Sequence, residues 1–188
     1  MKKKEQVRES GALPLMGQVV FLRELAPSDV GDRYLSWMQD EEIGRYLESR
    51  FMVHTLESLA EFVEKQTASE RNWMFAICRG FDGQHIGNIK LGPVNDHHGL
   101  AEIGLLVGER SMHGKGIATE AIRLVSRFAF ETLDLRRLTA GMYAHNVASR
   151  RAFEKCGFKV EGILRAHFRC EDEFVDGWRL GLLREEFM

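Results

Sequence analysis

Hydrophobic residues recur along this chain with two different spacings. In residues 55–69 and 117–133 they return every three or four positions, which predicts two amphipathic helices. Residues 19–25 and 101–107 are short apolar runs rich in β-branched side chains, which is typical of strands. Segments with the helical spacing alternate along the chain with strand-like segments, which indicates a domain that combines helices with a sheet.

The remaining segments extend this pattern. A helix is predicted over 27–38, a hairpin over 73–78 and 84–91 with its turn at 82–83, strands over 137–143, 158–164 and 174–183, and a short helix over 146–156. Gly157 fits the C-terminal cap of that short helix. Neither a repeat nor a linker interrupts the pattern, so we expect one mixed α/β domain over 17–188. Residues 1–16 carry charges without an apolar run and are expected to form a flexible tail.

Composition narrows the function classes. The 188 residues contain 26 Lys and Arg against 28 Asp and Glu, and this formal charge of -2 argues against a general grip on nucleic acid. The three cysteines form no CxxC pair, and the seven histidines lack the spacing of a metal site, so we expect reduced thiols in a cytoplasmic protein without a metal. No apolar run reaches membrane-spanning length.

The segment His113-Gly-Lys-Gly-Ile-Ala-Thr119 joins a predicted strand to a predicted helix. Glycines allow a sharp turn there, and the free amides at a helix start attract anions, so the segment suits a phosphate. A nucleotide-hydrolase loop is excluded because Gly116 follows Lys115 where Ser or Thr is required. The dinucleotide fingerprint also fails, since Thr119 replaces its third glycine. A plain tight turn without a ligand stays open at this point.

Three motifs occur in a fixed order around this loop. They are the strand Glu102-Ile-Gly-Leu-Leu-Val107 with the glycine loop behind it, then Asn146-Val-Ala-Ser149, and then Gly157-Phe158 with the closing run from Asp176 to Glu186. Together they resemble the GNAT superfamily of acetyl-CoA-dependent N-acetyltransferases, in particular the branch that contains the ribosomal-protein N-terminal acetyltransferases. The resemblance implies a mostly antiparallel twisted sheet of about seven strands flanked by about four helices. It also implies a homodimer as one oligomeric state.

The resemblance implies where acetyl-CoA lies. The pyrophosphate rests on the amides of the glycine loop, and the pantetheine arm runs along the strand before it, where an amide from Leu106 or a neighbour polarises the thioester. The implied coenzyme-binding residues are Leu105, Leu106, Val107, Met112, His113, Gly114, Lys115, Gly116, Ile117, Ala118, Thr119, Asn146, Ser149 and Phe153. His113 departs from the Gln or Arg usual in the family, and the loop is one residue longer than the common pattern.

The resemblance also implies the catalytic groups. Glu161 is the first candidate for the base that deprotonates the amine, and Glu102 is the second. Ser149 is the candidate acid for the leaving thiolate, although it also suits a plain helix start capped by Asn146. Phe153 stands where many relatives have a proton-donating tyrosine, so that donor is missing here.

The acceptor stays open between a protein α-amino group, a polyamine and an amino sugar. The acidic segment from Gln39 to Tyr46 corresponds to the family's acceptor wall and suits a cationic amine, while a solvated run of surface charge is the better explanation of the segment taken alone. The competing function is a non-catalytic coenzyme A-binding module for sensing or assembly, which needs neither Glu161 nor Glu102. Neither a nucleic acid nor a membrane is expected as a partner.

Overall fold

The computed structural model describes residues 3–170 and 172–188. In this part of the chain eight strands form one sheet in the order β1-β2-β3-β4-β5-β6-β8-β7. Neighbouring strands are antiparallel except β5 and β6, which are parallel. The strands are β1 (Leu15–Met16), β2 (Val20–Glu24), β3 (Trp73–Arg79), β4 (His85–Leu91), β5 (Leu100–Val107), β6 (Arg137–Tyr143), β7 (Lys159–Cys170) and β8 (Glu173–Leu183).

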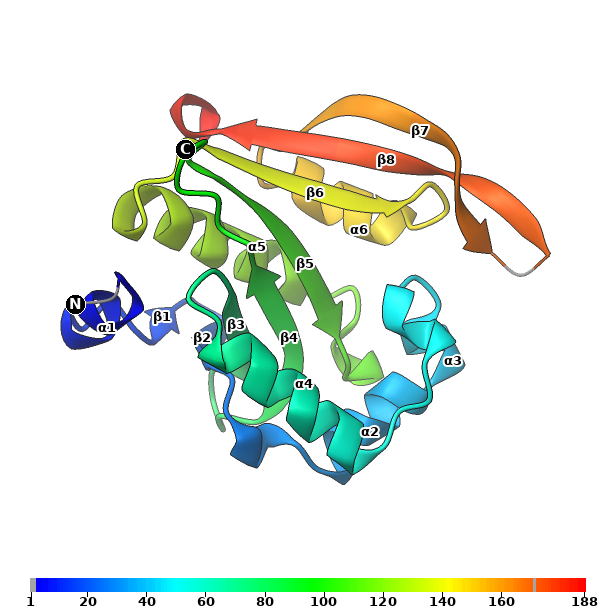
Figure 1. Ribbon diagram of the computed structural model, residues 1–188, viewed down its shortest axis with the longest axis horizontal. Coiled ribbons are helices and arrows are strands. Elements are labelled where there is room, and N and C mark those ends of the chain that lie inside the picture. The colour runs from blue at the N-terminus through cyan, green and yellow to red at the C-terminus, as the bar shows by residue number, and fades with distance from the viewer. Residues whose placement is uncertain (1–2, 171) are drawn as a thin grey trace.

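Helices cover both faces of this sheet (Figure 1). They are α1 (Lys3–Glu9), α2 (Asp32–Gln39), α3 (Glu41–Gly44), α4 (Leu56–Ala68), α5 (Ile117–Arg127) and α6 (Val147–Glu154). Short 3-10 turns are η1 (Pro27–Asp29), η2 (Glu48–Phe51), η3 (Arg110–Met112) and η5 (Arg184–Glu186), and a π turn, η4 (Phe128–Thr132), extends α5. The expected mixed, mostly antiparallel fold is confirmed.

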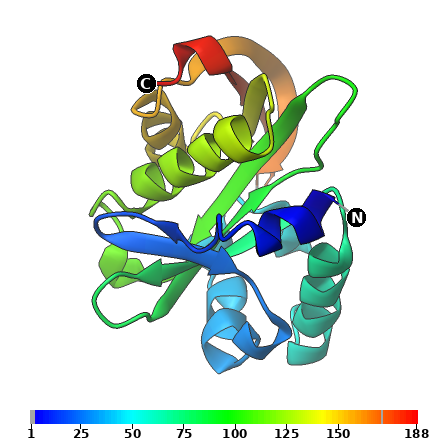
Figure 2. The same ribbon diagram turned by 90° about the vertical axis from the view of Figure 1, so that its left-hand side faces the viewer.

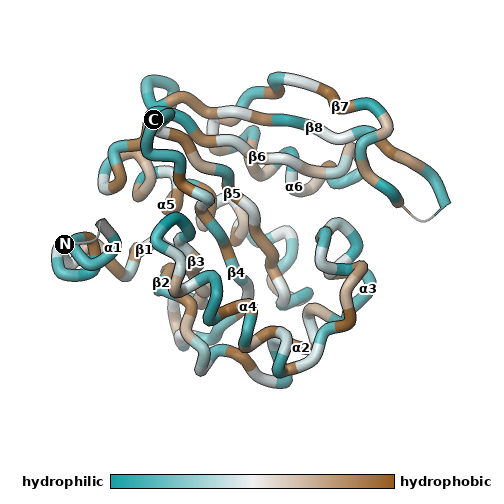
Figure 3. The backbone as a smooth tube through the Cα atoms, in the orientation of Figure 1, coloured by the Kyte–Doolittle hydropathy of each residue, from teal (hydrophilic) through white to brown (hydrophobic). Residues whose placement is uncertain are grey.

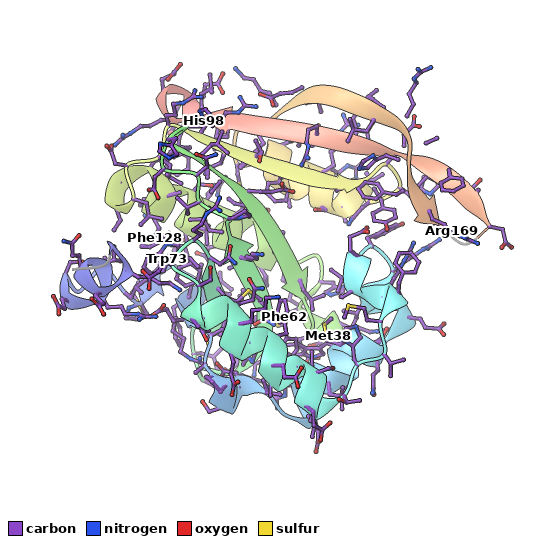
Figure 4. All side chains as sticks on the ribbon, in the orientation of Figure 1. Met38, Phe62, Trp73, His98, Phe128 and Arg169 are labelled. Atoms are coloured by element: carbon purple, nitrogen blue, oxygen red, sulfur yellow. The ribbon has the colours of Figure 1, made fainter. Side chains whose placement is uncertain are left out.

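The main core lies between the sheet and α5. The apolar stripe of α5, with Ile117, Ala121 and Val125, packs against buried residues of the central strands. Trp73 of β3 meets Phe128 edge to face with 5.0 Å between ring centroids, and both are labelled in Figure 4. Apolar residues dominate the central strands, while polar ones mark the outer loops (Figure 3). This packing fixes the start of α5 relative to β5.

A second core holds α2 and α4 on the other face. Tyr34 and Trp37 of α2 pack with Leu59 and Val63 of α4 against β3. Figure 4 labels Met38 and Phe62 on these two helices. The chain from α2 through α3 to α4 therefore has two anchored ends, and α3 lies between them.

The N-terminal segment differs from the expected flexible tail. Helix α1 packs beside the end of α4 (Figure 2). Lys4 donates to the carbonyls of Thr67 at 3.1 Å and Ser69 at 2.9 Å, and its ammonium lies 5.2 Å from the ring centroid of Trp73. Carbonyls at a helix end and an aromatic face both attract a cation, and Val7 is buried beside them. Within the described residues no helix is long and apolar enough to cross a membrane.

Candidate functional site

The two central strands β5 and β6 separate along their length. They pair only from Leu100 to Glu102 with Arg137 to Thr139, although β5 continues to Val107 and β6 to Tyr143. Beyond Thr139 the sheet opens into a V, visible in Figure 1. Main-chain groups along both inner edges of this V have no neighbouring strand.

The register decides which groups face the opening. Gly108 donates to Ile86 and Gly92 donates to the carbonyl of Glu102, so the even-numbered residues of β5 bond to β4. Leu105 therefore presents its N–H and C=O to the gap. Leu106 bonds toward Asn88 of β4 instead, so of the expected donors, Leu106 or a neighbour, the register favours the neighbour Leu105.

A cleft of about 750 Å³ occupies this opening. Five segments that are far apart in the sequence line it: α3 with η2, β5, the turn before α5 with that helix's first residues, β6 with α6, and the β7–β8 hairpin. All the expected coenzyme-binding residues line it except Lys115, whose side chain is exposed. The cleft residues from those expectations are Leu105, Leu106, Val107, Met112, His113, Gly114, Gly116, Ile117, Ala118, Thr119, Asn146, Ser149 and Phe153.

The turn before α5 has the geometry of an anion cradle. Gly114 has φ +73° and Gly116 has φ +82°, a left-handed conformation that strains residues with a side chain. Gly116 is the N-cap residue of α5. No side chain among the described residues makes the capping hydrogen bond, so the first amides of α5 are available to a ligand. Nothing lies within 4 Å of a Cβ built on either glycine, so the turn is open toward a ligand. These residues fit a pyrophosphate.

Basic groups surround this turn. Arg151 of α6 and Lys155, the residue at the C-cap of this helix, line the same cleft as the turn. Arg123 of α5 donates to the carbonyl of Lys155 at 3.1 Å, which holds the end of α6 against α5. The ring Nε2 of His113 lies 2.8 Å from the carbonyl of Val107, so His113 braces the turn. We call this half of the cleft the donor end.

Helix α6 supplies the floor between the two halves. The Asn146 side chain accepts from the Ser149 amide at 3.1 Å and caps the helix, as expected. The Ser149 hydroxyl lines the cleft, so capping and a catalytic role are compatible. Phe153 is buried and packs edge to face on Phe158 with 4.9 Å between ring centroids.

Glu102 reaches the cleft from the point where β5 and β6 separate. Its Oε1 accepts from Nη1 of Arg179 of β8 at 3.2 Å, and both side chains are nearly half exposed. Lys90 of β4 lies on the same face, where burial lowers its pKa and the charge of Glu102 partly offsets that effect. An arginine of the cleft therefore holds the Glu102 carboxylate in position.

Glu161 is not brought to the cleft. It is the extra residue at an irregularity in the pairing of β7 with β8, and its carboxylate lies against Gly181 and forms an ion pair with Arg137 of β6. This bulge turns Glu161 along the sheet and away from the V. Its position does not support the role of first candidate base.

Side chains from distant segments build the other half of the cleft, which we call the acceptor end. The Tyr143 hydroxyl donates to Oε1 of Glu48 in η2 at 2.6 Å, and burial and then this carboxylate raise the pKa of Tyr143 to about 12. Tyr143 stacks on Phe168 of β7 with 4.1 Å between ring centroids. Tyr46 completes this aromatic group and donates to the carbonyl of His145 at 3.3 Å.

A bulge in β7 brings a histidine to the acceptor end. Pairing with β8 is interrupted between Leu164 and Phe168, and Ala166 within the interruption has φ +48°. The Ala166 amide donates to Asp176 at 2.9 Å, which holds this strained turn, and His167 beyond it lines the cleft.

Sequence reasoning missed most of the acceptor end. Tyr46 and the carboxylate of Glu42 lay in the expected acidic segment, but Glu48, Tyr143, His167 and Arg179 carried no local signal. Each becomes a site residue only because the sheet brings its strand or turn to one place. The described residues contain no group of three or more potential metal ligands.

Comparison with known proteins decides the family. The model of the acetyltransferase (GNAT) domain matches residues 20–159. The chain belongs to the GNAT family. The SPbeta prophage-derived uncharacterized N-acetyltransferase YokL of Bacillus subtilis is 30% identical over 171 residues, which cover 91% of this chain and 93% of that protein.

Two further relatives carry names of specific enzymes. Spermidine N(1)-acetyltransferase of Escherichia coli is 27% identical over 69% of this chain and 68% of that protein. The crystal structure of spermidine N-acetyltransferase from Vibrio cholerae in complex with CoA and spermine superposes with a TM-score of 0.80 at 22% identity, over 90% of this chain and 98% of that one. This likeness shows the shared fold.

This GNAT protein is an acetyl-CoA-dependent N-acetyltransferase. The alternative of a non-catalytic module is thereby set aside. The expected superfamily is confirmed, while the ribosomal-protein branch stays a prediction.

Proposed function

We propose that this enzyme acetylates the primary amine of a small cationic acceptor of the polyamine class, by direct transfer from acetyl-CoA. The observation that carries the proposal is the charge division of the cleft. Glu42, Glu48 and Glu102 line it together with Arg179 and the aromatic group of the acceptor end, so carboxylates outnumber the guanidinium there. The amides of the turn, Arg151 and Lys155 line the donor end. Carboxylates and aromatic faces both attract ammonium groups.

The donor end accounts for one substrate. The amides at the start of α5 hold the pyrophosphate, and the unpaired main-chain groups of Leu105 bind the pantetheine arm as an added strand would be bound. Acetyl-CoA supplies the activated acetyl thioester. The Leu105 N–H is a donor in the gap, the kind of group that stabilises negative charge developing on an acyl oxygen.

Glu102 is the base in this proposal. An ammonium group must lose a proton before its nitrogen can attack, and an amine with an ordinary pKa of about 10.4 is charged at neutral pH. Glu102 Oε1, held by Arg179, takes that proton directly or through a water molecule. Ser149 is the group on the leaving-group side of the cleft. As the C–N bond forms and the C–S bond breaks, its hydroxyl takes up the second proton of the attacking nitrogen and passes its own proton to the departing sulfur.

The relatives support the acceptor class. The Escherichia coli relative is named for spermidine, and at 27% identity it is a sequence relative of this chain. A protein α-amino group remains the competing acceptor because the expected branch acts on ribosomal proteins. Exposed Phe51, Met52 and Val53 follow the η2 wall, and such a surface suits a polypeptide.

An amine panel tests the proposal. Thiol release from acetyl-CoA is measured with spermidine, an unblocked peptide and an amino sugar, for the wild type and for Glu102→Gln. We expect release with spermidine and its loss in the variant. Acetylation of the peptide without acetylation of spermidine would overturn the acceptor class, and undiminished turnover in Glu102→Gln would overturn the base.

A further inference from the structure

Arg110 joins two elements that are 70 residues apart in the sequence. Its Nε lies 3.1 Å from Oδ2 of Asp40, and its Nη2 lies 2.6 Å and 2.8 Å from the two carboxylate oxygens. Its Nη1 also forms an ion pair with Glu42. Such a two-pronged contact fixes orientation as well as distance. One guanidinium therefore connects η3 to the start of α3.

Asp40 is the residue on which α3 depends. Its Oδ1 accepts from the amides of Glu42 at 3.0 Å and Ile43 at 3.1 Å, which makes it the N-cap. A helix of four residues is far too short to be stable alone, so its position depends on contacts at its ends. At the far end Tyr46 and Glu48 contact His145 and Tyr143, and at the near end Asp40 contacts Arg110.

Arg110 is equally tied to the donor end. Its carbonyl accepts from the His113 amide at 3.0 Å, and Met112 between them is buried in the main core. The turn with Gly114 and Gly116 follows directly. A ligand that orders this turn therefore also orders the backbone that carries Arg110.

We propose that Arg110 is a positioning residue that couples donor and acceptor binding. An anion on the turn steadies η3, Arg110 then holds Asp40, and Asp40 holds α3 with the cleft carboxylate Glu42 in place. Binding at either end favours the same arrangement of α3, so the coupling is positive and reciprocal. This inference rests on the proposed function for the identity of the acceptor end.

Hydrogen exchange with coenzyme A tests the coupling without any acceptor. In the wild type, coenzyme A slows exchange in residues 40–51 by about threefold or more, whereas in Arg110→Ala that segment does not respond. Asp40→Asn is the second variant, because asparagine still caps a helix but loses the charge that Arg110 grips. We expect Asp40→Asn to abolish the response of residues 40–51 as Arg110→Ala does. This result would show that the coupling depends on the ion pair and not on the N-cap.

The chain contains a matched control. Arg79 contacts Asp82 in the β3–β4 turn with the same two-pronged geometry, Nε to Oδ1 at 2.9 Å, and neither residue lines the cleft. Arg79→Ala keeps the full response of residues 40–51. A response that survives in Arg110→Ala, or one that Arg79→Ala also abolishes, would overturn the proposal.

Kinetics with spermidine as the probe provide the second arm. Arg110→Ala raises the KM for spermidine about fivefold while kcat changes less than twofold, because the residue positions the acceptor wall and does not touch the reacting atoms. If no amine is acetylated while the exchange pattern holds, the acceptor proposal fails and the coupling stands. If spermidine is acetylated with the same KM in both proteins, the coupling fails and the acceptor proposal stands.

Discussion

The two ends of the cleft are built in opposite ways. The donor end is mostly main chain from one continuous stretch, the edge of β5 and the turn into α5. The acceptor end is mostly side chains, contributed by α3, η2, β6, β7 and β8. A main-chain site tolerates side-chain change but depends on backbone geometry, whereas a side-chain site changes its ligand with single substitutions. The following predictions test this difference, beginning with the largest effect.

Replacing Glu102 breaks the chemistry where the two ends meet. Glu102→Gln keeps the shape and removes the proton acceptor, so kcat falls about 100-fold or more. Steady-state kinetics with acetyl-CoA and spermidine measure it. Glu161→Gln is the matched control, because its carboxylate pairs with Arg137 outside the cleft. A larger loss in Glu161→Gln than in Glu102→Gln would reverse the assignment.

Changing the backbone of the turn should act mainly on the donor end, and on the acceptor end only through Arg110. Gly116→Ala places a Cβ in the left-handed conformation at the turn, and we expect coenzyme A to bind about tenfold more weakly by calorimetry because the first amides of α5 shift. Gly83→Ala is the control, since Gly83 has φ +70° in the remote β3–β4 turn. Both variants lose about 1 kcal/mol of stability. Equal coenzyme affinities in the two would show that the turn does not bind the donor.

Changing a side chain of the acceptor wall without changing the position of α3 should act mainly on the acceptor end. Glu48→Gln removes a carboxylate of that wall, and we expect the KM for a cationic amine to rise about fivefold with no change in coenzyme A affinity. The hydroxyl of Tyr143 still finds an acceptor in the amide oxygen, so the wall keeps its shape. Weaker coenzyme binding in this variant would contradict the separation of the two ends.

Lowering the pH should destabilise the packing of α2, which supports the acceptor end. We expect this effect to be the smallest of the four predictions. Burial lowers the pKa of His85 below 6.5, and its ring packs on Trp37 of α2 with 5.0 Å between centroids. The neutral imidazole is favoured in the folded state, so its stabilising contribution is present above pH 6.5 and is lost as the pH falls through the folded pKa. Melting temperature between pH 7 and pH 5 should therefore fall less in His85→Gln than in the wild type. An equal fall of the melting temperature in both proteins would show that His85 does not cause the acid sensitivity.

The sequence predicts the donor end of the cleft better than the acceptor end. The glycines of the turn and the apolar stripe of α5 are local signals, because a left-handed turn and a helix face are properties of neighbouring residues. The acceptor end depends on which strands become neighbours. Tyr143 and Glu48 are 95 residues apart, and no local pattern announces their hydrogen bond.

The differences between the predicted and the observed elements also have physical causes. Strand β7 runs to Cys170, beyond the expected end at residue 164, because the bulge at Ala166 interrupts its hydrophobic alternation without ending its pairing. The amphipathic pattern of residues 117–133 is continuous, but the π turn η4 ends the regular helix at Arg127. Lys4 is polar, and its burial is explained by the carbonyls at the end of α4 and the ring of Trp73, which are distant in the sequence.

Glu120 shows how the N-terminal segment influences a ligand it never touches. This carboxylate lies in the first turn of α5, and it accepts from the amides of Gln18 at 2.6 Å and of Val19 and Val20 at 2.9 Å. Those three bonds tie the start of α5 to the backbone that leads into β2. The segment before β2 therefore braces the helix start, and we expect a chain shortened to begin after Val20 to bind coenzyme A more weakly, because the first amides of α5 lose this support.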